Sequence, residues 1–199
     1  LCEEVGADAK EVERGLKSES RIGPKAYLSP GGAFAGGTLA RDISFLTQLG
    51  DRHAQATHLL SAVRSSNDQH KKWAGRKLQS LFGDLDGRHV AVWGLTYKPG
   101  TDTLRRSSSI ELCVWLAALG VRVQAHDPAV NVLPDDLARK ITPFQTPQAA
   151  LSKATALVIA TEWPEYKTVS AEDIFSAMTL PAIIDPNHFL IKTIGADSR

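Results

Sequence analysis

A chain of 199 residues is long enough for one large domain or two small ones, so a miniprotein held together by disulfides is excluded. Hydrophobic residues make up 43% of the chain and charged residues 23%, which are ordinary values for a folded globular protein. The 23 lysines and arginines nearly balance the 22 aspartates and glutamates, leaving a net charge of +1. The composition therefore indicates no nucleic-acid partner, and any anion site must be local.

The two cysteines, Cys2 and Cys113, lie far apart and form no C-x-x-C pair, so we predict a reducing, cytoplasmic environment rather than a disulfide framework. The six histidines show no metal-binding spacing, and we expect no metal site. Because the sequence contains no apolar run of about 18 residues, we expect no membrane partner. Residues 1–5 resemble the end of a helix whose start is missing, so we expect a fragment of a longer protein.

The first half of the chain, residues 1–83, has the pattern of a helical domain. Asp8 and Glu11 have the spacing of a capping box, which predicts a short helix over residues 9–16. Residues 18–37 are rich in glycine and proline and predict one long loop, either a flexible linker or a loop whose backbone approaches a ligand. An apolar stripe then marks a further helix, with members Leu39, Ile43, Leu46 and Leu49.

A single long helix is predicted from about residue 51 to residue 82. A helix of roughly 30 residues spans about 45 Å, which is longer than a small domain is wide, so it should pack on the second domain or on another subunit. Asn67 lies on the apolar stripe and is interpreted as a satisfied buried polar group rather than a ligand. The predicted buried face comprises Ala56, Leu59, Leu60, Val63, Asn67, Ala74, Leu78 and Leu81.

The second half, residues 84–199, alternates between short apolar runs and helical periodicity. Strands are predicted at residues 90–95, 121–125, near 140–143, 156–161 and 182–185, with helices between them. This alternation predicts an α/β fold with a parallel sheet, helices on both faces and ligands beyond the carboxyl ends of the strands.

The loop after the first predicted strand carries three cations, Lys98, Arg105 and Arg106, ahead of a helix that Ser108 is predicted to cap. Two interpretations remain open for this loop, a phosphate site at the helix N-terminus and a solvated basic loop. The segment lacks the G-x-G-x-x-G dinucleotide fingerprint. Asp127 is interpreted as a turn-forming residue rather than a ribose ligand, and Cys113 has the spacing of a core residue.

Several ordered segments resemble signatures of the UDP-glucose/GDP-mannose dehydrogenase family, the nucleotide-sugar dehydrogenases, over essentially the whole chain. Residues 33–42, AFAGGTLARD, match in outline the family motif GFGGSCFxKD, and residues 94–107, GLTYKPGTDTLRRS, match GxxFKxxTDDxRES. Residues 6–8, 21–23, 127–128 and 161–163 are also similar to family signatures. The resemblance implies a helical central dimerisation domain over residues 1–83, followed by a Rossmann-like nucleotide-sugar-binding domain over residues 84–199.

Members of that family use NAD to oxidise the C6 alcohol of a nucleotide sugar twice, with a cysteine thiolate that traps the aldehyde. The resemblance implies that the main NAD-binding domain lies outside this chain. It places Thr38 at the position of the cysteine and Arg41 at that of the motif lysine, and it retains Asp42. Because a threonine hydroxyl is far less acidic than a thiol, we expect the covalent second oxidation to fail and this chain alone to be inactive.

The resemblance also implies binding roles. Arg21 corresponds to an arginine that reaches the partner subunit's substrate site, Arg105 to a contact with a cofactor phosphate, and the long helix to a homodimer interface. Two positions depart from the family, because Arg106 replaces a glutamate and Asn187 stands where an arginine is expected. The residues expected to contact the nucleotide sugar are Arg21, Tyr27, Leu28, Ser29, Gly31, Phe34, Tyr97 and Lys98.

Three functions remain open from the sequence. The first is part of an NAD-dependent nucleotide-sugar 6-dehydrogenase-like oxidoreductase, which by resemblance would serve polysaccharide biosynthesis. The second is a non-catalytic module that binds a UDP- or GDP-linked sugar or dimerises, which Thr38 and Asn187 favour. The third is a full-length protein that carries out a single oxidation and stops at the aldehyde.

Overall fold

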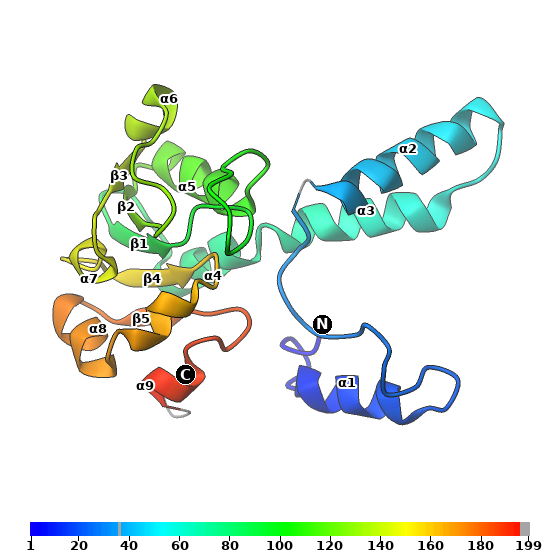
Figure 1. The fold of residues 1–199 in the computed structure, drawn as a ribbon, viewed down its shortest axis with the longest axis horizontal. Helices are drawn as coiled ribbons and strands as arrows, with labels where there is room; N and C mark the ends of the chain where they lie inside the picture. Colours follow the sequence, from blue (N-terminus) through cyan, green and yellow to red (C-terminus); the bar gives the residue numbers. More distant parts are fainter. Residues whose placement is uncertain (36, 196–199) are drawn as a thin grey trace. The chain divides into compact units, whose positions relative to one another are not determined.

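The computed structural model describes residues 1–35 and 37–195, and Gly36 of the predicted glycine-rich motif lies outside them. The chain divides into two compact units, Leu1–Gly32 and Ala33–Arg199. Figure 1 shows the elements of both units in chain order. Within the described ranges, no helix is long and apolar enough to cross a membrane.

The first unit contains one helix, α1, at Ala9–Ser18. The Asp8 carboxylate caps it by accepting hydrogen bonds from the backbone N–H groups of Lys10 and Glu11, at 2.7 and 3.4 Å. This confirms the predicted start of the helix, because the cap satisfies N–H groups that have no partner inside the helix.

The second unit begins with two helices that lie side by side, α2 at Thr38–Arg52 and α3 at His58–His70 (Figure 1). Gly50 of α2 allows the segment that leads into α3 to pass close to α2. A Cβ atom at position 50 would lie 2.3 Å from Cγ2 of Thr57. The positive φ of Ala54, 50°, falls in the turn between the two helices.

The single long helix predicted over residues 51–82 is wrong. Residues 51 and 52 belong to α2, and a second break at residues 71 and 72 separates α3 from α4, which spans Trp73–Phe82. At this break the N–H of Lys72 bonds the carbonyl of Gln69, three residues back, at 3.2 Å, so the helix tightens and interrupts its regular bonding.

The predicted buried face of these helices is covered only in part. Asn67 and Leu78 are buried, and Leu60 and Ala74 are half-buried. The other predicted members are exposed, and two of them, Leu59 and Val63, lie on α3, the helix on which α2 packs. Those exposed members are Ala56, Leu59, Val63 and Leu81.

A five-stranded sheet forms the centre of the second unit, with strand order β3-β2-β1-β4-β5 and every pair parallel. The strands are β1 at His89–Trp93, β2 at Arg122–His126, β3 at Ile141–Pro143, β4 at Ala156–Ile159 and β5 at Ala182–Ile184. The predicted fold class is confirmed, with each strand within two residues of its expected position. Strand order reverses between β1 and β4, the switch point at which such sheets bind ligands.

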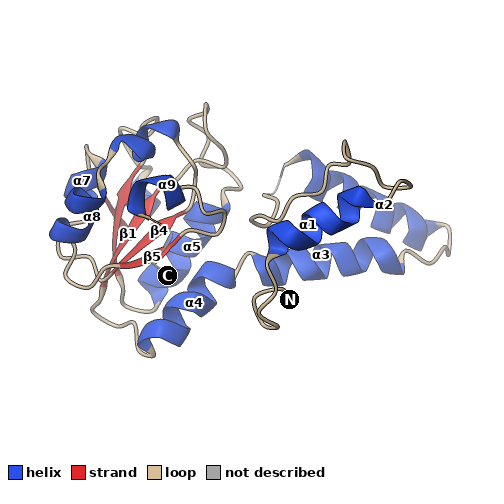
Figure 2. Ribbon diagram, turned by 90° about the horizontal axis from the view of Figure 1, so that it is seen from below, coloured by secondary structure: helices blue, strands red, loops and turns tan. Residues whose placement is uncertain are grey.

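Helices cover both faces of the sheet (Figure 2). One face packs on α4, on α5 at Ser108–Ala118 and on α6 at Asp135–Ala138, whereas α7 at Pro147–Ala150, the 3-10 helix η1 at Pro164–Thr168 and α8 at Ala171–Ala177 cover the other. A final short helix, α9, spans Ile191–Ile194. In β1, Val90 and Val92 point to the first core and Ala91 and Trp93 to the second, as the two-residue period of a strand requires.

Gly94 ends β1 at a point where the chain passes very close to the end of β4. Its φ is +92°, and a Cβ atom would lie 2.3 Å from Cβ of Thr161. Only glycine accepts both conditions, because a side chain would be strained by the left-handed backbone and would also overlap the neighbouring strand.

We predict that Gly94→Ala lowers the free energy of unfolding by about 3 kcal/mol or more, since strained backbone and overpacking both contribute. Urea denaturation followed by tryptophan fluorescence measures the loss. Gly87→Ala is the matched control, because Gly87 also has a positive φ, +68°, but faces open space. An equal loss in the two variants would contradict the close contact with Thr161.

Candidate functional site

The carboxyl edge of the sheet is organised by the buried carboxylate of Asp127, which directly follows β2. Its Oδ2 atom accepts hydrogen bonds from the backbone N–H groups of Leu95 and Thr96, at 2.6 and 2.9 Å. The Thr96 hydroxyl and the Trp163 indole N–H also donate to Oδ2, both at 3.1 Å. Asp127 therefore joins the ends of β1, β2 and β4 around one charge.

The Asp127 side chain also makes the turn that the sequence predicted, because Oδ1 accepts the N–H of Ala129 at 2.9 Å. Because both oxygens accept hydrogen bonds from the protein, the carboxylate has the structural role that the turn interpretation predicted. A second tie reinforces the edge, since the Thr161 hydroxyl donates to the Thr96 carbonyl at 2.5 Å. The sequence pattern predicted neither the hydrogen bonds to Oδ2 of Asp127 nor the bond from Thr161 to Thr96, because the bonded residues lie 31 to 65 positions apart.

Tyr97 and Lys98 follow this fixed edge in the chain, and both residues are exposed. The Lys98 ammonium lies 5.4 Å from the centre of the Tyr97 ring, and the Tyr97 N–H donates to the Thr103 carbonyl at 3.2 Å. A ring and a cation thus stand together at the switch point of the sheet, on a loop whose root cannot move without breaking buried hydrogen bonds.

The basic loop continues through Arg105 and Arg106, both exposed, to the start of α5. The predicted cap Ser108 is wrong by one position, because Ser107 accepts the N–H of Ser109 at 3.2 Å. Ser107 has the extended backbone that a cap requires, whereas Ser108 is already the first helical residue. Among the described residues, the Ser108 hydroxyl is one of two buried side-chain oxygens without a hydrogen-bond partner.

The described part of the glycine-rich loop is held by Asn67 of α3. The Asn67 side chain accepts the Phe34 N–H at 2.9 Å and donates to the Phe34 carbonyl at 3.0 Å. The Asn67 amide thus pairs with the Phe34 backbone as a neighbouring strand would in a sheet. Because its oxygen and its nitrogen are both hydrogen-bonded, Asn67 is confirmed as a satisfied buried polar group.

The three residues that the sequence predicted for a reaction centre lie at the start of α2. Thr38 is the exposed first residue of the helix, and the Arg41 guanidinium lies 3.2 Å from the Asp42 carboxylate. In the described residues no other side chain is seen to bond Thr38, so nothing here would activate its hydroxyl as a nucleophile.

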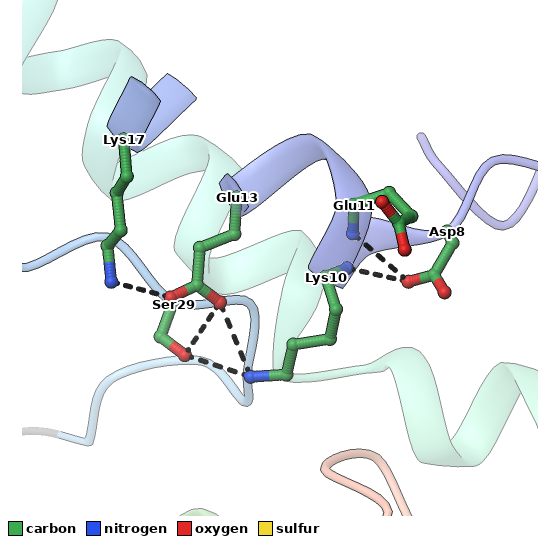
Figure 3. Close-up of polar contacts among 6 residues, drawn as sticks. All are labelled: Asp8, Lys10, Glu11, Glu13, Lys17 and Ser29. Carbon is green, nitrogen blue, oxygen red and sulfur yellow. Dashed lines mark hydrogen bonds and ion pairs between the residues drawn. The ribbon is translucent and has the colours of Figure 1, made fainter. Parts of the chain in front are cut away.

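The remaining predicted contacts belong to the first unit and surround α1. Figure 3 shows the Ser29 hydroxyl between Lys10 and Glu13, at 3.2 Å from Nζ and 3.4 Å from Oε2. Arg21 forms a two-point contact with Glu19, at 3.0 and 3.1 Å, and this contact lowers the pKa of the glutamate. Tyr27, Leu28 and Gly31 are exposed.

One groove of about 530 Å³ gathers some of the predicted residues, with Phe34 and Arg41 in its lining. Arg106, one of the three cations of the candidate phosphate loop, lines it too, and so does Asn67, which was not a predicted site residue. Tyr97, Lys98 and Arg105 are not part of its lining. The second unit thus carries two separate features, the Asp127 edge and this groove.

Cys113 and His126 are two titratable groups buried in the second unit. Burial raises the pKa of the Cys113 thiol to about 12, so it is the inert core residue that its spacing predicted. Burial also lowers the pKa of His126, whose ring packs edge-on against Tyr166 with centroids 5.6 Å apart. Throughout residues 1–35 and 37–195, no group of side chains is suited to hold a metal ion.

Comparison with known families finds two sequence models that match this chain. The model for the UDP-glucose/GDP-mannose dehydrogenase family, central domain, matches residues 1–69. The model for the same family, UDP binding domain, matches residues 91–192. The boundary predicted between residues 83 and 84 falls in the interval between the two matched ranges.

Individual proteins are similar over nearly the whole chain. UDP-glucose 6-dehydrogenase of Pseudomonas aeruginosa is 35% identical over 192 residues, which cover 93% of this chain and 42% of that protein. UDP-glucose 6-dehydrogenase of Rickettsia prowazekii is 34% identical and covers 98% of this chain and 46% of its own length. A UDP-glucose dehydrogenase structure from Pyrobaculum islandicum superimposes with a TM-score of 0.74 at 28% identity, covering 90% of this chain and 44% of that one. The chain therefore spans less than half the length of these relatives.

We predict that Asp127→Asn lowers the free energy of unfolding by about 3 kcal/mol, because an amide NH₂ would face N–H donors that now share a buried carboxylate. Thermal or urea unfolding followed by circular dichroism measures the change. Asp51→Asn, at an exposed position in α2, is the control and should change stability by no more than about 0.5 kcal/mol. Similar small losses in both variants would remove Asp127 from the centre of the edge.

Proposed function

Because the chain belongs to the UDP-glucose/GDP-mannose dehydrogenase family, we propose that it supplies the nucleotide-sugar-binding part of an NAD-dependent 6-dehydrogenase-like oxidoreductase. The observation that carries this proposal is the switch point between β1 and β4, where a buried carboxylate fixes the root of an exposed Tyr97-Lys98 pair. The similar UDP-glucose 6-dehydrogenases support the choice of a UDP-linked sugar.

The exposed pair has the chemistry that a nucleotide sugar requires. The Lys98 ammonium would pair with the diphosphate, and the Tyr97 ring offers an apolar face with a polar tip. By resemblance, Phe34 is a further proposed contact in the second unit. The contacts proposed by resemblance within the first unit are Tyr27, Leu28, Ser29 and Gly31, and Arg21 is proposed to reach the site of a partner subunit.

The chemistry of the proposed reaction centre follows from Thr38, Arg41 and Asp42. A threonine hydroxyl does not form the thioester that a thiolate forms, so a covalent second oxidation is not open to this chain. Asp42 would orient water or a hydroxyl, and Arg41 would contribute a fixed charge rather than a proton, since a guanidinium stays protonated.

NAD fits these residues only in part. Arg105 exposes a guanidinium ahead of the N-terminus of α5, a suitable contact for a cofactor phosphate. The 199 residues contain no G-x-G-x-x-G fingerprint, so we propose that the main NAD contacts come from outside this sequence. NAD, when bound, would accept the hydride that leaves C6 of the sugar.

A homodimer is proposed through α2 and α3, whose outer faces expose apolar side chains. The free thiols of Cys2 and Cys113 favour a reducing, cytoplasmic location. The exposed apolar residues of the two helices are Leu39, Phe45, Leu46, Leu49, Leu59 and Val63.

A second candidate function is a nucleotide-sugar-binding or dimerisation module without catalysis. Two observations favour it: Thr38 stands at the reaction centre, and the Asn187 amide, where an arginine was expected, bonds the Glu162 carboxylate. Asn187 therefore contributes no positive charge to the carboxyl edge. Both candidate functions require the chain to bind the sugar nucleotide. They differ in whether the full-length protein oxidises it.

We predict that calorimetric titration detects binding of UDP-glucose or UDP and that Lys98→Gln weakens it about tenfold, since a charge-assisted contact to the diphosphate is lost. Lys140→Gln is the control, because Lys140 is exposed just before β3, at the opposite edge of the sheet. Titration with GDP-mannose compares the two nucleotide classes. If none of the three ligands, UDP-glucose, UDP and GDP-mannose, binds, the proposal is overturned.

We also predict no reduction of NAD when the purified chain is mixed with NAD and UDP-glucose, measured as absorbance of the reduced cofactor. The full-length protein then separates the candidates. One reduced cofactor per sugar supports a single oxidation to the aldehyde, and none supports the non-catalytic module. Two per sugar would contradict the role assigned to Thr38.

A further inference from the structure

Three aromatic rings lie together in the second unit, next to the carboxyl edge of the sheet. Trp93 ends β1, His126 ends β2 and Tyr166 belongs to η1. The Trp93 and Tyr166 rings stack with centroids 4.8 Å apart, and the His126 ring meets the Tyr166 ring edge-on at 5.6 Å. We call these three residues the aromatic cluster. Tyr166 is fully buried and His126 is 8% exposed, so an ionisable ring is buried in this cluster.

The aromatic cluster is bonded to the backbone that leads into the Asp127 edge. The Tyr166 hydroxyl donates to the His126 carbonyl at 2.8 Å. The same carbonyl accepts the N–H of Gly94, also at 2.8 Å, at the point where the chain after β1 turns. Tyr166 therefore holds η1 against the end of β2, and a displacement of Tyr166 alters the carbonyl that Gly94 uses.

The hydrogen bonds of Tyr166 determine which nitrogen of the His126 ring is protonated. Because the Tyr166 hydroxyl gives its proton to the His126 carbonyl, its oxygen faces Nδ1 of the ring as an acceptor, at 3.3 Å. Nδ1 therefore carries the one proton of the neutral ring, and a second proton must arrive at Nε2. That second proton gives the ring a positive charge.

Burial and nearby groups act on this charge in opposite directions. Burial lowers the pKa of His126 and is the largest influence on it. The pKa is raised by Asp127, the next residue in the chain, by a hydrogen bond to the backbone of Gln145, and by Glu165, an exposed residue of η1. Tyr166 stays neutral, because burial raises its pKa. Burial outweighs the other influences, so the ring is neutral at neutral pH and its charged form is disfavoured inside the cluster.

We propose that the aromatic cluster is a pH-sensitive contact between β2 and η1. When His126 takes up a proton at acid pH, the charged ring leaves the cluster towards water and the Glu165 carboxylate, and Tyr166 loses its contact with the ring. The η1 segment then loosens from the end of β2, and the turn at Gly94 loses order with it. At neutral pH the uncharged ring keeps the contact closed. The inference rests on packing and charges within the second unit and does not depend on dehydrogenase activity.

The test is an NMR titration of the chain from about pH 7.5 to about pH 5, which follows the His126 ring and the backbone amides of residues 94–96 and 163–169. The ring should titrate with a midpoint below 6.5, the ordinary pKa of histidine. The amides of both segments should shift with the same midpoint as the ring. A ring midpoint at or above 6.5, a ring that stays neutral throughout, or amides that do not follow the ring would each overturn the proposal.

A charge variant tests the path of the ring. Glu165→Gln should fold, because Glu165 is exposed, and it should lower the midpoint of the ring and of both amide segments together, since a carboxylate that favours the charged ring is removed. Glu172→Gln on α8 is the matched control, which removes the same charge from another exposed position and should leave these midpoints unchanged. Equal midpoints in Glu165→Gln and the unmodified chain would contradict the movement towards Glu165.

The pH dependence of stability gives an independent measure. Because the unfolded chain protonates His126 below 6.5 while the folded chain keeps it neutral, this contribution to stability is complete above that pH and is lost as the pH falls. His126→Gln takes up no proton there, so its urea midpoint should fall less than that of the unmodified chain between about pH 7.5 and about pH 5.5. His53→Gln, at an exposed position, is the control and should lose as much as the unmodified chain. Equal losses in all three proteins would remove His126 as the source of the pH response.

Discussion

The hydrogen bonds that converge on the Asp127 carboxylate hold the carboxyl edge of the sheet in the second unit. Parallel strands bring their carboxyl ends together, but they do not determine where the following loops go. Here a single buried charge receives N–H and O–H donors from the chain after β1, the turn after β2 and the segment after β4. A buried carboxylate is costly without such partners, so the loops are held to the positions that satisfy it.

The same constraint explains why Gly94 and Thr161 belong together. The backbone after β1 must turn sharply to present its N–H groups to Asp127, and it does so against the end of β4. The Thr161 hydroxyl closes this contact by donating to the Thr96 carbonyl. Tyr97 and Lys98 follow an edge that is already fixed, which makes these exposed loop residues suitable for ligand contact.

The sequence predicted the sheet well and the helical half less well, for physical reasons. Buried parallel strands leave continuous apolar runs that local pattern detects, as at Val90 to Trp93. The interruption at Lys71 and Lys72 leaves no such sign, because lysine favours helix and carries no turn signal. Ser107 and Ser108 both suit a cap, and a pattern of residue types cannot choose between neighbours of the same type.

For the candidate site, sequence reasoning located the loops but not the bonds that hold them. It placed Lys98 and Arg105 on the loop after β1 and recognised Asp127 as a turn residue. The four contacts to Oδ2 of Asp127 come from residues 31 to 36 positions away, and no local spacing encodes them. The groove was not predicted for the same reason, because its lining residues come from elements that are distant in sequence, although Arg41 and Arg106 were each singled out.

We propose above all that the edge built on Asp127 contacts the nucleotide sugar. Amide chemical-shift mapping of the chain during titration with UDP-glucose tests it most directly. We predict that the largest shifts occur at residues 95–98 and 161–163, with little change at the opposite ends of the strands. Shifts confined to those opposite ends, or no shifts at saturating ligand, would contradict it.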